Sequence, residues 1–149
     1  MSKHHDADLI LKLYDLRREE VMRQARNWFF VDFNPESVQD IQTVVMGEHS
    51  PYFRMVTTYW DMACSLVNNG AIDSKMFSDA NAEHIGVYLK LEPLLTELRE
   101  NFNMPNYMQQ IEECIKNAPD GEEKLTKMRE RVQQFKAMRE AAAKTAQAS

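Results

Sequence analysis

The stretch TTYWDMACSLVNNGAID, residues 57–73, places a carboxylate, a thiol and several hydroxyls within an apolar run. Such groups can act as a general base, a nucleophile or a metal ligand. On a helix, the four residues Arg54, Thr58, Asp61 and Ser65 recur at spacings of four, three and four. They form one narrow polar stripe on a helix that is otherwise largely apolar. The stripe therefore either faces water or forms hydrogen bonds to a neighbouring helix.

Asp61 needs a cationic partner if it is buried, because an unpaired buried carboxylate costs several kcal/mol. Arg17 and Arg54 are the candidates for a buried ion pair with it. We predict that Asp61 is structural and that the chain has no catalytic residue; the alternative is an enzyme that uses Asp61 with one of these arginines. Cys64 lies beside the stripe without a histidine close to it in sequence, which predicts a buried, inert thiol.

Short motifs for known chemistries are missing from the chain. It contains no GxxxxGK[ST], GxGxxG, HExxH or GxSxG. Neither His49 nor His84 has a glutamate three residues before it, which excludes the paired Glu-x-x-His motifs of helical di-metal proteins. The N-terminus should be frayed. We expect only adventitious transition-metal binding there, by the side chains of His4, His5, Asp6 and Asp8. We predict no metal site and no cofactor.

The composition predicts a single all-α domain. The 149 residues are 44% hydrophobic and 28% charged, with only 4 glycines and 5 prolines, which favours a globular helical protein. The net charge of −5 disfavours nucleic-acid binding. No apolar run is long enough to cross a membrane, and the N-terminus has no signal-peptide core. The two cysteines form no CxxC, which is typical of a reducing cytoplasm.

Apolar spacing and helix caps predict a bundle of five to seven helices. The expected helices cover residues 7–31, 35–46, 51–69, 81–102 and a segment from 105, with a further short helix after Asp73. The helix over 51–69 is apolar on most sides and should be central. Residues 1–119 form the body of this bundle, and a long amphipathic helix follows over 120–149, with a frayed end from 146.

The final helix is the predicted partner-binding element. Its apolar stripe consists of Leu125, Met128, Val132, Phe135 and Met138. Residues 120–149 hold seven basic and five acidic residues, for a charge of +2, whereas residues 1–119 hold eleven and eighteen, for −7. A lone helix of this kind is marginal in water, so it must dock on a body, either its own or that of a second copy. We favour the second copy, which predicts a homodimer.

Two further surfaces could bind partners. The arginines of the first helix could hold an acidic protein partner or a phosphate, or could form a solvated face: Arg17, Arg18, Arg23 and Arg26. Four large side chains could line a small-molecule pocket, or could simply fill the core: Trp28, Tyr59, Trp60 and Met62.

The runs YDLRREEVMRQARNWFF and YFRMVTTYWDMACSLVNNGAID resemble an uncharacterised family of bacterial all-helical proteins of unknown function. The likeness covers roughly residues 9–115. It implies an α-helical fold and a bacterial source, and it implies no activity. The expected function is therefore a non-enzymatic interaction or regulatory module that self-associates, with a small-molecule-binding helical domain as the alternative.

Overall fold

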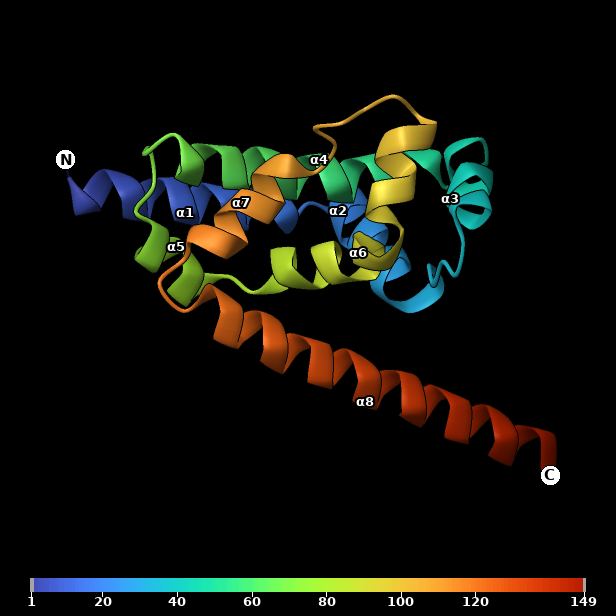
Figure 1. Ribbon diagram of the computed structural model, residues 1–149. Helices are drawn as coiled ribbons and strands as arrows, with labels where there is room; N and C mark the ends of the chain where they lie inside the picture. Colours follow the sequence, from blue (N-terminus) through green and yellow to red (C-terminus); the bar gives the residue numbers. More distant parts are fainter. Residues whose placement is uncertain (1, 149) are drawn as a thin grey trace.

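The computed structural model describes residues 2–148, which fold into α-helices and one π-helical turn, η1 (Figure 1). In chain order these are α1 (Lys3–Arg17), α2 (Glu20–Asn27), η1 (Trp28–Asp32), α3 (Val38–Val45), α4 (Ser50–Asn68), α5 (Ser74–Ala80), α6 (Glu83–Asn101), α7 (Gln109–Asn117) and α8 (Gly121–Ala148). The described residues contain no strand, and the predicted all-α class is confirmed.

The first predicted helix, over 7–31, is divided in two, so the described chain has eight α-helices instead of five to seven. The division lies at Glu19, whose ψ of 145° is not helical. Its carboxylate accepts hydrogen bonds from the backbone N–H groups of Val21 (3.0 Å) and Met22 (2.9 Å). Glu19 thus caps α2, because these donors have no partner within the helix.

Helix α4 is the centre of the bundle, as its apolar pattern predicted. It contacts α2, α3, α5, α6, α7 and η1. Trp60 is fully buried on α4, and its ring lies edge-on to that of Tyr59 at a centroid distance of 5.0 Å. The Tyr59 hydroxyl donates to the backbone carbonyl of Leu13, which ties α4 to α1. None of the described helices is long and apolar enough to cross a membrane.

The N-terminal segment is helical from Lys3, so the frayed terminus predicted there is wrong. Asp6 explains the order, because it is buried against the chain just before α5. Its Oδ2 accepts a hydrogen bond of 2.9 Å from the backbone N–H of Asp73. His4 and His5 are exposed.

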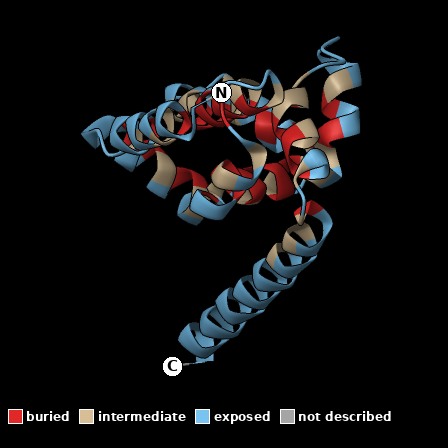
Figure 2. Cartoon of the chain, turned by 90° about the vertical axis from the view of Figure 1, so that its left-hand side faces the viewer, coloured by how far each residue is buried: buried red, intermediate tan, exposed pale blue. Residues whose placement is uncertain are grey.

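Helix α8 begins on the body and then diverges from it (Figures 1 and 2). Leu125 and Met128 pack against the core, and Lys124 Nζ donates to the carbonyl of Ser78 at 2.6 Å. Every described residue from 129 onward is exposed. The helix continues to Ala148, beyond the point at which fraying was predicted; Ser149 lies outside the described residues.

Candidate functional site

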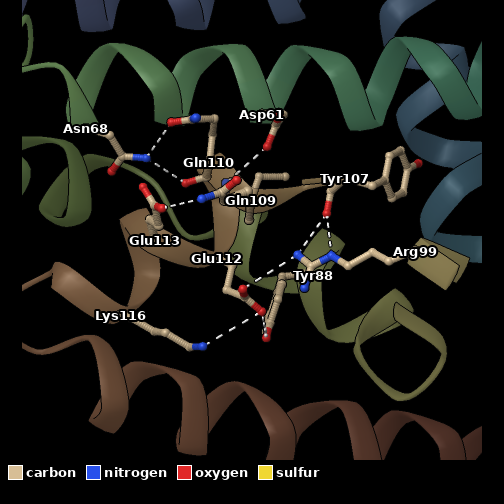
Figure 3. Close-up of polar contacts among 11 residues, drawn as sticks. Asp61, Asn68, Tyr88, Arg99, Tyr107, Gln109, Gln110, Glu112, Glu113 and Lys116 are labelled. Atoms are coloured by element: carbon tan, nitrogen blue, oxygen red, sulfur yellow. Dashed lines mark hydrogen bonds and ion pairs between the residues drawn. The ribbon is translucent and has the colours of Figure 1, made fainter. Parts of the chain in front are cut away.

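Asp61 lies on the side of α4 that faces the start of α7 (Figure 3). Helix α7 begins poorly capped, because Met108 before it has a left-handed backbone (φ 60°) and its side chain makes no capping hydrogen bond. Asp61 Oδ1 accepts a hydrogen bond of 3.1 Å from the backbone N–H of Ile111, the third residue of α7. This is the donor that an N-cap side chain normally satisfies. Asp61 therefore caps α7 from a neighbouring helix.

The predicted ion pair between Asp61 and an arginine does not form among residues 2–148. Arg17 instead donates from Nη1 to Asn81 Oδ1 at 2.9 Å, and its guanidinium lies 5.3 Å from the centre of the Trp60 ring. Arg54 is exposed, and seven residues separate it from Asp61, about 10 Å along the helix axis. Asp61 is only partly buried, and burial raises its pKa while the backbone hydrogen bonds from α7 oppose that rise. A partly buried cap needs no cation.

Further contacts drawn in Figure 3 fix α7 against α4 and α6. Asn68 Nδ2 donates to the carbonyl and to the Oε1 of Gln110, both at 2.9 Å. From α6, Arg99 donates to the carbonyl of Tyr107 at 2.8 and 3.0 Å and lies 3.5 Å from Glu112. The Tyr88 hydroxyl donates to the other oxygen of Glu112 at 3.0 Å. This network positions a helix that is only nine residues long.

A groove of about 630 Å³ lies beside Asp61, between α4 and the turn that precedes α7. Its walls are Thr57, Thr58, Asp61, Met62, Ser65 and residues 104–108. Of the two alternatives for the four large side chains, core filling holds for Trp28, Tyr59 and Trp60, which are buried, whereas Met62 lines the groove. The polar stripe of α4 thus forms one wall of an open groove, and one member of the stripe, Asp61, also caps α7.

The four arginines proposed to hold an acidic partner divide into two pairs. Arg17 is engaged with Asn81, and Arg26 forms an ion pair of 2.8 Å with Glu83 on α6. Arg18 and Arg23 are exposed on the surface. Half of the predicted surface is therefore occupied by contacts within the bundle.

Cys64, His84 and Cys114 meet in the core, although they come from α4, α6 and α7. One ligating atom of each lies within 4.8 Å of those of the other two, and all three residues are buried. Both cysteines are free. The cluster has no sequence motif, because each of its residues is isolated in sequence. The only signal was that Cys64 follows Trp60, and Cys114 follows Ile111, at helical spacing on core-facing sides.

Burial and a hydrogen bond between the two thiols shift the pKa of all three groups in the cluster. Burial lowers the pKa of His84 to about 4, with a further contribution from nearby Lys124, so the imidazole is uncharged at neutral pH. A hydrogen bond to Cys114 and burial both raise the pKa of the Cys64 thiol, while the same hydrogen bond lowers the pKa of Cys114. Within residues 2–148, two buried side-chain polar atoms have no hydrogen-bond partner: His84 Nδ1 and Trp60 Nε1. Their rings lie 5.8 Å apart.

The apolar stripe of α8 divides into a docked part and an exposed part. Leu125 and Met128 pack on the body, whereas Val132, Phe135 and Met138 are 39%, 62% and 65% exposed. The predicted partner-binding residues therefore lie on one helix but in two environments.

Comparison with known proteins gives a family match that covers the body of the bundle and ends before α8. No curated protein and no solved structure matches the chain. A family model described as a domain of unknown function, DUF4760, matches residues 3–118, from the start of α1 to the residue after α7. The resemblance to an uncharacterised family is thereby confirmed, and the chain belongs to the DUF4760 family of domains of unknown function.

Proposed function

We propose that the protein is a non-enzymatic interaction module that forms a homodimer through the distal part of α8. The observation that supports this proposal is the exposure of Phe135 and Met138 on a helix whose first turns are already docked. Large apolar side chains in a row on a helix are a common mark of a contact surface. The two free cysteines favour a reducing, cytoplasmic location for this module.

Docking of α8 on its own body leaves this stripe uncovered. Arg129 forms an ion pair of 2.7 Å with Glu92 on α6, and Arg139 Nη1 donates to Asn34 Oδ1 farther along the body. These two exposed arginine side chains reach the body from the part of α8 that diverges from it, while Phe135 between them remains mostly exposed. Because the intramolecular contacts are satisfied without covering the stripe, a second copy is the partner that we propose for it.

Charge favours the body of the second copy over its final helix. The segment 120–149 carries +2 and the segment 1–119 carries −7, so each final helix is attracted to a body. If each copy offers its distal helix to the other, the assembly closes with two-fold symmetry.

The test compares two double variants of the full chain. Phe135→Glu/Met138→Glu places two charges in the stripe. Gln133→Glu/Ala137→Glu places the same charges on the opposite side of α8, since successive residues turn by about 100°. We expect wild type and the Gln133/Ala137 variant to be dimers by light scattering, and the Phe135/Met138 variant to be a monomer. A wild-type protein that is monomeric at high micromolar concentration would refute the proposal.

A second candidate function is small-molecule binding in the groove beside Asp61. The groove volume of about 630 Å³ lies in the range of ordinary ligand sites. A ligand found by thermal-shift screening should raise the melting temperature of wild type and not of Thr58→Trp, which fills the groove. An equal rise in both proteins would place the ligand elsewhere.

A further inference from the structure

Three residues of the core offer the donor set of a soft metal site. Two thiols and one imidazole, from Cys64, Cys114 and His84, place their ligating atoms within 4.8 Å of one another. Thiolate and imidazole donors select Zn²⁺ and Cu⁺ over the hard cations that prefer oxygen ligands. In a tetrahedral zinc site with Zn–S bonds of about 2.3 Å, neighbouring donors lie about 3.7 Å apart. Movements of about 1 Å would therefore bring these three donors into coordination distance.

One nitrogen of the imidazole in this cluster has no hydrogen-bond partner among the described residues. His84 is 3% exposed, and its Nδ1 has no hydrogen-bond partner. Trp60, four residues before Cys64 on α4, has an equally orphaned Nε1. Buried polar atoms without partners are rare in folded proteins, and an unaccounted ion is one of the standard explanations. Of the two such atoms of residues 2–148, only the His84 nitrogen can bind a cation, since the Trp60 indole N–H is a donor, and the imidazole of His84 lies within the cluster of the two cysteines.

The helices that carry the donors are fixed independently of the cluster. Asp61 and Asn68 hold α7 against α4, on either side of Cys64 in sequence, by the hydrogen bonds to Ile111 and Gln110. Arg99 and Tyr88 hold α7 against α6 through Glu112, two residues before Cys114. Donors on helices that are fixed in this way can bind by small local movements, without the need to fold the chain around the ion.

We propose that Cys64, His84 and Cys114 bind a single thiophilic d¹⁰ metal ion, Zn²⁺ or Cu⁺. Two thiolates and a neutral imidazole give Zn²⁺ an uncharged complex, which a buried site favours over a charged one. Zinc sites with three protein ligands complete their coordination with a water or a substrate atom. On binding, each thiol that becomes a ligand gives up its proton to solvent, and no electron is transferred.

The test uses the full chain, reduced and treated with a chelator, and titrated with Zn²⁺ and, in a separate anaerobic arm, with Cu⁺. We expect one equivalent of one ion to bind and to raise the melting temperature by about 5–10 °C at saturation. Co²⁺ as a probe should show thiolate charge-transfer bands. Cys64→Ser and Cys114→Ser should each weaken binding on the order of 100-fold or more. His84→Gln should weaken it while it keeps a polar side chain of similar size.

The matched control is His4→Ala/His5→Ala, which removes the exposed histidines that could hold a stray ion. This variant should bind like wild type. The melting temperature of each metal-free variant is measured first, and the Co²⁺ spectrum of wild type decides the question if a core variant does not fold. Three results would overturn the site: no stoichiometric binding of either ion, binding that is lost with His4 and His5 but kept without the cysteines, or an isolated protein in which Cys64 and Cys114 form a disulfide.

Discussion

Replacement of Asp61 separates a helix cap from an ion pair. In the structure its Oδ1 accepts the Ile111 N–H at 3.1 Å, and no arginine contacts it within the described chain. Asp61→Asn keeps a carbonyl oxygen at the same place and removes the charge. Asp61→Ala removes both. If the carboxylate acts as a cap, the alanine variant should be clearly destabilised and the asparagine variant should not.

The magnitudes follow from the geometry. Loss of a side-chain N-cap costs about 0.5–2 kcal/mol, so Asp61→Ala should lower the free energy of unfolding by about 1–2 kcal/mol. Burial raises the pKa of Asp61 above 3.8, its value outside the fold, so ionisation is less favourable in the folded chain than in the unfolded chain. The folded chain then holds this proton to higher pH than the unfolded chain, and stability falls as pH rises through that window. Asp61→Asn escapes this loss, and we expect it to lie within about 0.5 kcal/mol of wild type at pH 7.

Urea unfolding followed by circular dichroism measures all three proteins, with Asp15→Ala on the exposed side of α1 as the control. The control should stay within about 0.5 kcal/mol of wild type. A loss of about 3 kcal/mol or more in Asp61→Asn would show that a buried arginine has lost its partner, and the cap would be the wrong explanation. An unchanged Asp61→Ala would show that α7 does not need the contact.

Three further predictions concern the core and the joints. Trp60→Ala should cost on the order of 3–5 kcal/mol in urea unfolding, but Trp60→Phe much less, because phenylalanine keeps ring contacts and removes an N–H that has no acceptor. Burial lowers the pKa of Lys90 from 10.5 to about 8, so unfolding free energy should rise between about pH 8 and 10 in wild type and not in Lys90→Met. Gly121→Ala should lower the melting temperature, since its Cβ would lie 1.9 Å from the Ile115 carbonyl oxygen; an unchanged value would show that α8 shifts freely.

Apolar periodicity was sufficient to predict the helical class and the central place of α4. These depend on side-chain spacing within one helix, which a single sequence contains. The same spacing predicted that the polar stripe of α4 faces water or a neighbouring helix. It could not identify the partner of Asp61, because that partner is a backbone N–H fifty residues away. Backbone groups have no sequence signature, so reasoning from side-chain charge alone selected an arginine.

The break at Glu19 and the cluster at Cys64 were missed for different reasons. Glutamate is a common helix-interior residue, and only its ψ of 145° reveals that it caps α2. The cluster depends on how α4, α6 and α7 pack, because its members are separated by twenty and thirty residues in sequence. Metal motifs in sequence detect ligands on one element, and a site shared by three helices has no such pattern.

Lys124 distinguishes the anchor of α8 from its proposed contact surface. Its Nζ donates to the carbonyl and the hydroxyl of Ser78, at 2.6 and 2.8 Å, and lies 3.5 Å from Asp120. Lys124→Met keeps the aliphatic stem and leaves the Ser78 carbonyl without this donor, which should cost about 1–3 kcal/mol of stability. The Lys124→Met substitution leaves the side chain of Phe135 unchanged, because Phe135 lies eleven residues farther along the helix.

If the dimer depends on how α8 leaves the body, Lys124→Met should both lower the melting temperature and weaken the dimer by sedimentation or light scattering. Phe135→Glu/Met138→Glu should abolish the dimer and leave the melting temperature of the monomer unchanged, since those side chains are exposed. A Lys124→Met protein that is less stable but dimerises with full affinity would show that α8 acts as a free tail. The orientation set by its first turns would then have no part in assembly.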